Sequence, residues 1–540
     1  MPDNQSAVIA FLQSSAAHPG VGPVETIKTH GALVFLDSDT ALKMKRAVRY
    51  DYMDFSTLAL REQMLRRELA LNQPVAPKIY HDVVPVTQDA EGRLAVDGQG
   101  KVVEWVLRMW RFPLKDELLV IAQSGGLTDA LAEDLGHSIF AYHTVAGKRD
   151  ADGRLLILGI LEELDRVFDG MKPELGAQAV ADFITQARAG LKKVSVLLTA
   201  RSADGHVRRC HGDLHLRNIV LIDGKPVPFD ALEFDEQLGT CDVLYDLAFL
   251  IMDLQHRDLQ TAANIVLNTY LLAAGGGEDA GLAALPLFVA VRAAIRAMVC
   301  VQTSGTPGKP DPEARAYLAE ALGALRPSTP RLVAVGGLSG SGKTTLARRL
   351  APGIGAAPGA VHLRSDLERK AMIGVEAQTR LSADHYSAAG RDQVYRRLLD
   401  RTSAILRAGH SVLLDATFIK PEKRTEAEAV AAALDIPFAG VWLEAPEATL
   451  VSRVNARVGN ASDADEAVLR SQLEQDAGRN TWHRVPTEGS LDAALAKARA
   501  VLAARLQHPR RRKQPPIWAD PRRPIPIDCR QCPICRHLRQ

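Results

Sequence analysis

The strongest chemical signal in the sequence is a glycine-rich segment in the second half of the chain. The run GLSGSGKTT, which begins at Gly337, fits the pattern G-x-x-x-x-G-K-[ST] and stands between a strand-like and a helix-like run. In such a loop backbone N–H groups turn toward phosphate, the lysine reaches the terminal phosphates and the threonine hydroxyl binds magnesium. The sequence therefore predicts a P-loop for ATP and Mg²⁺. Its predicted nucleotide-binding residues are Gly337, Ser339, Gly340, Ser341, Gly342, Lys343, Thr344 and Thr345, with Thr344 also a magnesium ligand.

Carboxylates and arginines follow the later predicted strands and helices of the same region. Asp415 ends the apolar run SVLLD and is a candidate ligand for magnesium or its water. In RSDLER, Asp366 is a candidate to accept a proton from a substrate hydroxyl, and Arg369 to bind a substrate anion. Arg453 and Arg457, one helical turn apart, are candidates for a lid over the transferred phosphate. Simpler roles stay open: caps for the aspartates and a solvated helix face for the lid arginines.

A second phosphate-handling set lies in the first half of the chain. The run HGDLHLRN contains Asp213 and Asn218, and Asp230 follows it after an apolar stretch and a turn. Phosphoryl transfer needs a carboxylate near the acceptor hydroxyl and oxygen ligands for magnesium. We therefore predict Asp213 as the general base, and Asn218 and Asp230 as magnesium ligands. A chance collection of polar loop residues is disfavoured, because three roles fall in order at sensible spacing.

This set resembles the aminoglycoside and choline-type phosphotransferases, whose catalytic loop reads H-G-D-x-H-x-x-N. The later run CDVLYDLAFL, with Asp246, is similar to the D-L-A helix of that family, whereas Leu216-Arg217 replaces its usual Pro-Gly pair. The resemblance implies an α+β, protein-kinase-like fold with a small N-terminal lobe. It also implies a lysine anchored by a glutamate of the next helix.

Two lysines compete for that role. Lys43 and Lys45 project to the same side of a predicted strand, and Glu68 lies on the helix that follows. Either lysine can pair with Glu68; we favour Lys43, and the alternative is that both are solvated strand lysines. No G-x-G-x-x-G run precedes them, so the turn about Ser38 is expected to cover the nucleotide.

Residues 331–507 resemble the small P-loop kinases of the gluconate kinase, polynucleotide 5′-kinase and zeta-toxin type, on the strength of the P-loop, SDLERK and SVLLDATF. The resemblance implies an α/β P-loop NTPase fold with a parallel sheet, Asp366 as the base and arginines in the lid. Such domains are often grouped under an AAA heading, but we see no ring-forming signature of AAA machines. The order of the two halves resembles bacterial aminoglycoside phosphotransferase/ATP-binding fusion proteins over about residues 1–507.

The elements that must position these residues divide the chain into four parts. Short strands between Val24 and Val48 and a helix from Phe55 to Leu71 precede a largely helical stretch that runs to about Val301. The Gly- and Pro-rich run TSGTPGKPDP then marks a boundary, with room for one helix before Pro327. We predict a kinase domain at 1–305, a linker at 306–330, a P-loop domain at 331–508, and a basic Pro/Arg/Cys tail at 509–540.

Composition limits the partners of the protein. The 540 residues are 46% hydrophobic and 24% charged, which is typical of globular domains. The net charge is +2, but the tail alone carries +7, so the rest of the chain is −5. A slightly acidic body gives no general attraction for nucleic acid, so a nucleic-acid partner is not favoured. We expect a small hydroxyl-bearing acceptor; the sequence does not indicate an oligomeric state.

The termini and cysteines indicate a cytoplasmic protein. Asp3 stands where a secretory signal would be positive, and the longest apolar stretch is interrupted by Arg292 and Arg296, so we expect no membrane segment. Isolated cysteines fit a reducing compartment. Four potential zinc ligands in the tail are spaced too tightly for a usual finger, so a disordered tail is favoured over a metal site. They are Cys529, Cys532, Cys535 and His537.

Two functions are consistent with these residues. The first is a two-module ATP-dependent kinase that phosphorylates small hydroxyl compounds, namely sugars, aminoglycoside-like compounds or nucleosides. The second is a regulatory or stress-response protein that binds ATP to switch a partner and transfers nothing at one or both sites. Two complete catalytic sets favour the kinase. We also expect the two sites to be chemically independent, so that halves ending near Ser304 and starting near Pro327 each bind magnesium-ATP.

Overall fold

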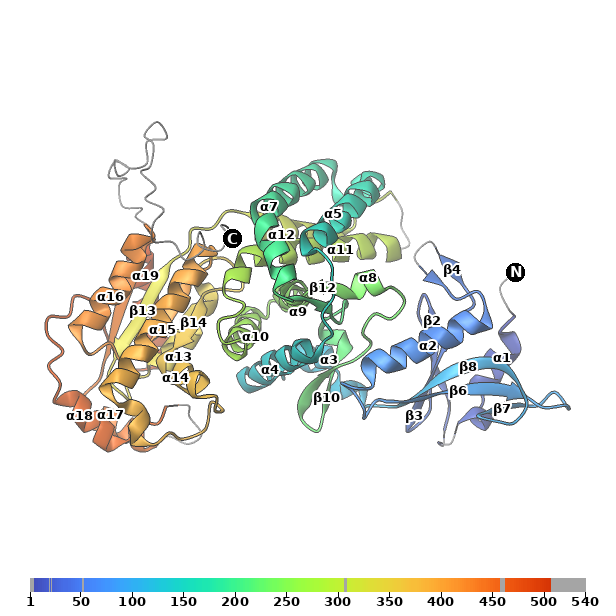
Figure 1. The fold of residues 1–540 in the computed structure, drawn as a ribbon, viewed down its shortest axis with the longest axis horizontal. Helices are drawn as coiled ribbons and strands as arrows, with labels where there is room; N and C mark the ends of the chain where they lie inside the picture. Colours follow the sequence, from blue (N-terminus) through green and yellow to red (C-terminus); the bar gives the residue numbers. More distant parts are fainter. Residues whose placement is uncertain are drawn as a thin grey trace, which may run out of the picture.

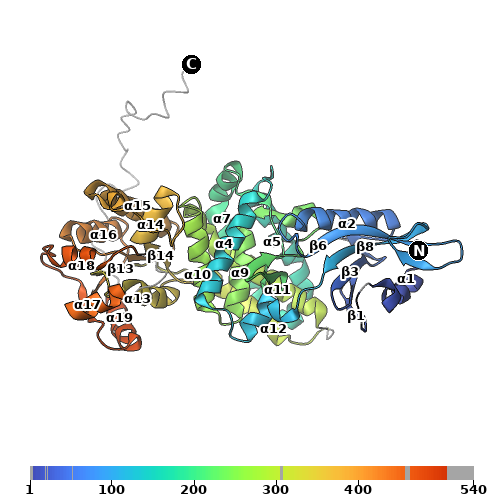
Figure 2. The ribbon, with the colours of Figure 1, turned by 90° about the horizontal axis from the view of Figure 1, so that it is seen from below.

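The computed structural model describes residues 4–506, apart from residues 19, 21, 51–52, 305–307 and 457–461. Three bodies lie in a row along the longest axis: a sheet-rich lobe, a helical lobe and a second α/β body (Figures 1 and 2). The first two form an α+β, protein-kinase-like domain and the third is an α/β P-loop domain with a parallel sheet, which confirms the predicted fold class. The predictions for Arg457, for the zinc ligands and for the basic tail lie outside the described residues.

The small lobe is built on a six-stranded antiparallel sheet of order β1-β2-β3-β8-β6-β7. Alternation in β3 sends Leu42 and Met44 into an apolar cluster with α1, and Lys43 and Lys45 to the opposite face, toward α2. This lobe comprises α1 (Ser6–Leu12), η1 (Ser15–Ala17), β1 (Glu25–Lys28), β2 (Ala32–Leu36), β3 (Thr40–Lys45), β4 (Arg49–Tyr50), β5 (Met53–Asp54), α2 (Leu58–Asn72), β6 (Tyr80–Gln88), β7 (Leu94–Val96) and β8 (Lys101–Trp110).

The large lobe is mainly helical, with two short antiparallel strand pairs, β9 with β12 and β10 with β11, around the HGDLHLRN run. Its elements are η2 (Leu114–Asp116), α3 (Leu118–Gln123), α4 (Asp129–Val145), α5 (Gly153–Gly170), α6 (Lys172–Leu175), α7 (Ala177–Ala203), β9 (Val207–Arg209), η3 (Leu216–Asn218), β10 (Ile219–Ile222), β11 (Lys225–Pro228), α8 (Glu236–Gly239), β12 (Thr240–Asp242), α9 (Val243–His256), α10 (Gln260–Ala273), η4 (Ala280–Ala284), α11 (Leu285–Thr303) and α12 (Pro312–Leu325).

One segment of the described chain, Ala280–Thr303, is long and apolar enough to cross a membrane, with a mean hydropathy of 1.9. It comprises η4 and α11, and α11 packs against α9 and α12. Of its most apolar window, 61% is buried inside the protein, and Arg292 lies within it at 5% exposure. Burial in the core of the lobe therefore accounts for its hydropathy.

Part of the predicted linker is helical. Within residues 306–330, α12 starts at an Asp311 cap and places Tyr317, Leu318 and Ala321 in the core, against α11 and α7. The helical lobe therefore extends to Leu325, and the extended connection to the next domain is only the few residues up to β13.

The P-loop domain contains a five-stranded parallel sheet of order β14-β15-β13-β16-β17. Because parallel strands have their carboxyl ends at one edge, the residues that follow β13, β14 and β15 meet there. Its elements are β13 (Leu332–Gly337), α13 (Lys343–Leu350), η5 (Ala351–Gly353), β14 (Val361–Arg364), α14 (Ser365–Ile373), η6 (Ala383–Tyr386), α15 (Ala388–Arg407), β15 (Val412–Asp415), α16 (Pro421–Ala433), β16 (Phe438–Glu444), α17 (Glu447–Asn455), α18 (Glu466–Leu473), β17 (His483–Pro486) and α19 (Leu491–Leu506).

The two domains share a packed interface. One cluster of buried apolar residues runs from the helical lobe into the P-loop domain, and α10 and η4 contact β14, α14 and α15 across it. Figure 1 shows α10 beside the P-loop domain. The helical lobe thus lies between the small lobe and the P-loop domain.

Candidate active sites

The predicted base and one predicted metal ligand of the N-terminal site lie side by side. The Asn218 side-chain amide donates to the Asp213 carboxylate at 3.0 Å and to its carbonyl at 2.9 Å, which leaves the Asn218 amide oxygen free for a metal. The imidazole Nε2 of His215 lies 3.3 Å from the same carboxylate. The side chain of Asp213 is 36% exposed, so an acceptor can reach it.

Electrostatics keep this base ionised. Burial alone would raise the pKa of the Asp213 carboxyl, but hydrogen bonding and attraction from His215, with His211 and Arg292 further off, hold it well below its usual range. Asp213 is therefore an anion over the whole physiological pH range. It can orient an acceptor hydroxyl and take its proton as phosphorus–oxygen bonding develops.

Asp246, for which the sequence analysis predicted no role, holds the HGDLHLRN loop in place. It is fully buried and accepts the backbone N–H groups of His211 at 3.0 Å and Gly212 at 2.9 Å. His143 Nε2 lies 3.1 Å from the same carboxylate. Burial would raise the pKa of Asp246, but the His143 hydrogen bond and charge bring it to about 2. His143 and Arg292, whose guanidinium donates to the Gly212 carbonyl at 2.9 Å, had no motif to reveal them.

Both candidate lysines pair with Glu68. Lys43 Nζ lies 2.6 Å from one Glu68 oxygen and Lys45 Nζ lies 2.7 Å from the other. The two differ in their second partner: Lys43 donates to Asp230 at 2.7 Å, whereas Lys45 donates to Glu233 at 2.5 Å and is only 2% exposed. The alternative of solvated lysines does not hold, and Lys43 is the one that faces the predicted metal ligand.

Asp230 belongs to the same site through its contact with Lys43. Its backbone has φ 61°, in the left-handed region, and its N–H donates to the Tyr80 hydroxyl at 2.9 Å. Burial raises its pKa, but Lys43 and then Lys45 lower it overall, so it is an anion. Asp230 and Asn218 together offer the hard oxygen donors that Mg²⁺ prefers.

The P-loop has the conformation that its glycines were predicted to allow. Gly337, Gly340 and Gly342 have φ of 142°, 85° and 89°, and a Cβ at Gly337 would lie 2.7 Å from the Leu443 carbonyl oxygen. Lys343 Nζ donates to the Leu338 carbonyl at 2.9 Å, inside the loop. The remaining predicted phosphate-binding residues of the loop, Ser339, Ser341 and Thr345, lie in the turn or first helical turn, and Ser339 N–H donates to Gln472 at 2.9 Å.

Thr344 and Asp415 come together as the order of strands requires. The Thr344 hydroxyl donates to Asp415 at 2.7 Å, at the carboxyl ends of β13 and β15. The His362 Nε2 lies 3.4 Å from the same oxygen, and Arg364 lies at 3.9 Å. Burial would raise the pKa of Asp415, but His362 and then Arg364 and Lys343 lower it to about 2. A hydroxyl and a carboxylate oxygen at the mouth of a P-loop fit Mg²⁺.

The predicted acceptor residues lie on α14. Asp366 is in its first turn, and burial, opposed by Arg364, raises the pKa of its carboxyl, which suits a base more than a fully solvated aspartate would. The Arg369 guanidinium donates to the His385 carbonyl at 2.8 Å and stacks on the Tyr386 ring, 4.6 Å from its centroid. Arg453, the described member of the predicted lid pair, donates to the Thr487 carbonyl at 2.6 Å and hydroxyl at 3.3 Å, and bonds to no P-loop residue.

Comparison with known proteins matches both halves. The model of a family described as AAA domain matches residues 332–477. The mycobacterial proteins Rv2004c of Mycobacterium tuberculosis (strain H37Rv) and Mb2027c of Mycobacterium bovis are each 30% identical over 507 residues, covering 89% of this chain and 96% of theirs. Their similarity therefore spans both domains.

Among solved structures, an APS kinase CysC of Mycobacterium tuberculosis in complex with AMPPNP and APS is 25% identical, with a TM-score of 0.26, over 33% of this chain and 99% of that one. A gluconokinase of Sinorhizobium meliloti is 23% identical, with a TM-score of 0.25, over 34% and 95%. A choline/ethanolamine kinase family protein of Mesorhizobium loti is 15% identical, with a TM-score of 0.34, over 59% and 93%.

Proposed function

This chain belongs to the family of the mycobacterial protein Rv2004c, and on that premise we propose that it is a cytoplasmic, two-site ATP-dependent phosphotransferase acting on small hydroxyl compounds. The observation that carries the proposal is the contact of Lys43 Nζ with both Glu68 and Asp230 at 2.6 and 2.7 Å. This contact joins a phosphate-binding cation to a metal-binding carboxylate, and Asp213 completes the set. A chance collection of polar loop residues would not be expected to form this contact.

At the N-terminal site, Lys43 would bind the ATP phosphates, and Asn218 and Asp230 would hold Mg²⁺. When bound, magnesium neutralises charge on the β- and γ-phosphates. Asp213 orients the acceptor hydroxyl and takes its proton as the acceptor oxygen bonds to the γ-phosphorus. The bond from that phosphorus to the bridging oxygen breaks, and ADP leaves.

At the C-terminal site, Lys343 and the P-loop N–H groups would bind the phosphates, and Thr344 with Asp415 would hold Mg²⁺. Asp366 would be the base and Arg369 an anion-binding residue for the acceptor. Arg369 donates to the His385 carbonyl and stacks on the Tyr386 ring, so acceptor binding at this residue would require it to exchange these partners.

A regulatory switch that binds ATP without transfer is the second candidate. It is favoured at the C-terminal site by one observation: the Arg369 guanidinium donates to the His385 carbonyl and the Arg453 guanidinium to the Thr487 carbonyl, so neither of these hydrogen bonds is made to a P-loop residue. At the N-terminal site the complete set of base, cation and metal ligands favours transfer.

Acceptor-dependent release of ADP separates the two candidates. The full chain with magnesium-ATP is offered sugars, aminoglycosides, nucleosides and oligonucleotides in turn. At least one hydroxyl compound should raise ADP release above the rate with water alone. ATP binding without stimulation by any acceptor class would support the switch instead.

A further inference from the structure

We infer that the helical lobe of the N-terminal domain positions the acceptor-side helix α14 of the P-loop site, with Asp279 as a positioning residue that acts through Arg401 and Glu368. The catalytic consequence of this inference rests on the proposed kinase function of that site. The structural part does not, because it concerns how α14 is held.

The key contact is a buried chain of charges across the domain boundary. Arg401 donates through Nε and Nη2 to the two oxygens of Asp279, both at 2.8 Å, and through Nη1 to Glu368. The side chains of Asp279, Arg401 and Glu368 are 3%, 6% and 1% exposed. A two-pronged pair of this kind fixes orientation as well as distance, and burial removes the competition from water.

Glu368 connects these buried ion pairs to the predicted acceptor residues of the P-loop site. It lies between Asp366 and Arg369 in the nine-residue helix α14, so any shift of its backbone moves both. Arg397 holds its other oxygen at 2.7 Å and also donates to the Gly275 carbonyl at 2.9 Å. Both arginines that hold Glu368 therefore also bond to the N-terminal domain.

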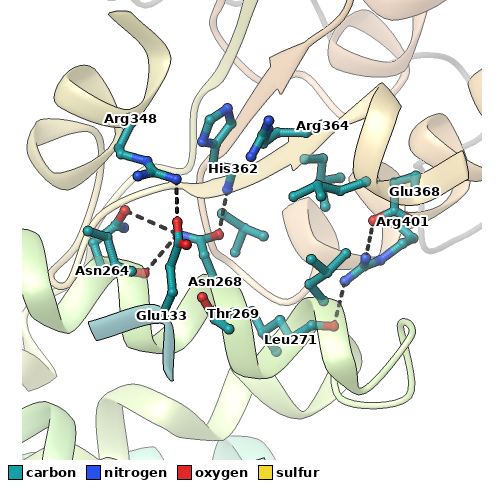
Figure 3. A pocket seen from close by; sticks show the side chains of 15 residues that line it. Glu133, Asn264, Asn268, Thr269, Leu271, Arg348, His362, Arg364, Glu368 and Arg401 are labelled. Atoms are coloured by element: carbon teal, nitrogen blue, oxygen red, sulfur yellow. Dashed lines mark hydrogen bonds and ion pairs between the residues drawn. The ribbon is translucent and has the colours of Figure 1, made fainter. Parts of the chain in front are cut away.

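A second link reaches the metal side of the same site. Asn268 on α10 accepts the backbone N–H of His362 at 2.6 Å, and the His362 ring lies 3.4 Å from Asp415, the carboxylate that accepts from Thr344. Figure 3 shows Asn268 and His362 meeting at the interface, with the contact between Arg401 and Glu368 beside them. Helix α10 thus contacts strand β14, which carries His362, and helix α14, which carries Asp366 and Arg369.

Helices α10 and α4, which contact the P-loop domain, are also bonded to other parts of the structure. The Tyr270 hydroxyl of α10 lies 2.9 Å from His143 Nδ1, and His143 holds Asp246 under the N-terminal catalytic loop. On the other side, Arg348 of the P-loop helix α13 bonds to Glu133 of α4. The P-loop domain therefore packs on helices that hydrogen bonds connect to the N-terminal catalytic loop, and α14 contacts one of them, α10.

The test uses the full chain with Asp279→Asn, which keeps size and removes charge. Its matched control is Asp165→Asn, which breaks the 2.7 Å surface pair with Arg188 away from the interface. Hydrogen exchange of peptides covering α14 should become about tenfold faster or more in Asp279→Asn, while peptides of the small lobe stay unchanged. Affinity for the ATP analogue AMPPNP should stay within about twofold. Exchange in α14 equal to that of Asp165→Asn would overturn the inference.

If the acceptor screen yields a substrate of the P-loop site, its kcat should fall roughly 10- to 100-fold in Asp279→Asn with KM for ATP retained, because misplacement of a catalytic group costs rate more than nucleotide binding. A fall in ATP affinity alone would count against the inference. Should Asp279→Asn not fold, the same exchange measurement is made on Arg397→Ala, which removes a side chain that is 29% exposed from the same glutamate. If the chain transfers no phosphate at all, the proposed function fails, but exchange of α14 still decides how it is held.

Discussion

Lys43 Nζ lies 2.7 Å from Asp230 Oδ1, although 187 residues separate the two in the chain. The strand alternation of β3 and the left-handed backbone at Asp230 bring them together from the two lobes. The contact closes the N-terminal site between the lobes. It also distinguishes Lys43 from Lys45, whose partners Glu68 and Glu233 leave it buried.

The two lysines should therefore fail in different ways. Lys43→Met should leave the folded protein near its normal melting temperature and abolish N-terminal transfer, because it removes the cation beside the phosphates. Lys45→Met should lower the free energy of unfolding by about 3–5 kcal/mol, because it leaves the buried Glu233 without the lysine that pairs with it and leaves Glu68 with Lys43 alone. Thermal unfolding and ATP affinity, measured on both variants, check this. Equal losses of stability in Lys43→Met and Lys45→Met would contradict a catalytic role for Lys43 and a structural role for Lys45.

The two sites should differ in their acid limits. A base must be ionised to accept a proton, so a lowered pKa moves the acid limb of the rate down and a raised pKa moves it up. His215 lowers the pKa of Asp213 below its usual range against the effect of burial, while burial raises that of Asp366. C-terminal transfer should thus decline at a higher pH than N-terminal transfer. Rate profiles of Asp213→Asn and Lys343→Ala chains, each with one site intact, give the comparison; coincident acid limbs would contradict it.

The extent of the N-terminal domain can be tested by truncation. A chain ending after Leu325 keeps α12, whereas one ending after Ser304 exposes the core positions that Tyr317, Leu318 and Ala321 cover. Removing three such buried side chains should cost several kcal/mol, at roughly 1.5–3 kcal/mol for a large apolar side chain. Urea unfolding of the two forms measures the difference. Equal midpoints would mean that α12 is a linker element without a stabilising role.

The catalytic loop should depend on a residue that does not touch substrate. Asp246→Asn replaces a carboxylate that accepts two backbone N–H groups and pairs with His143 by a neutral amide. N-terminal transfer should fall about 10²-fold through loss of loop geometry, with C-terminal ATP binding unaffected. ATP affinity at each site and the acceptor-stimulated rate are the measurements. Retention of full N-terminal transfer would show that the loop is held by other contacts.

The parts of the sites that could be predicted are those whose residues lie close together in one short segment of the sequence. The P-loop and HGDLHLRN each place backbone and side chains by local geometry, so residue types at fixed spacing sufficed. The α/β pattern predicted a parallel sheet but not its strand order, and Asp415 was found because it ends the apolar run SVLLD. Local spacing did not say which lysine faces the predicted metal ligand, since both pair with Glu68 and they differ only in whether Asp230 or Glu233 is the second partner.

The contacts between domains had no such signal. Asp279 and Arg401 are 122 residues apart, and Asn268 accepts a backbone N–H, which any residue type except proline at position 362 would supply. Arg453 could be assigned to a helix, but not to Thr487 as its partner, because that pairing depends on where β17 ends. Long-range polar contacts of this kind depend on the final arrangement of the elements rather than on spacing.

Whether the chain has two phosphate-transfer sites is decided by measuring the transfer of labelled γ-phosphate. The wild-type chain, Asp213→Asn, Lys343→Ala and the double variant are each given magnesium-ATP and every acceptor that stimulates ADP release. Each single variant should lose transfer to one acceptor class and keep the other, with Asp213→Asn retaining N-terminal ATP affinity because its effect, on the order of 10²–10⁴ in rate, lies in proton transfer. The double variant should transfer nothing. Transfer by the double variant, or loss of all transfer in one single variant, would contradict two independent sites.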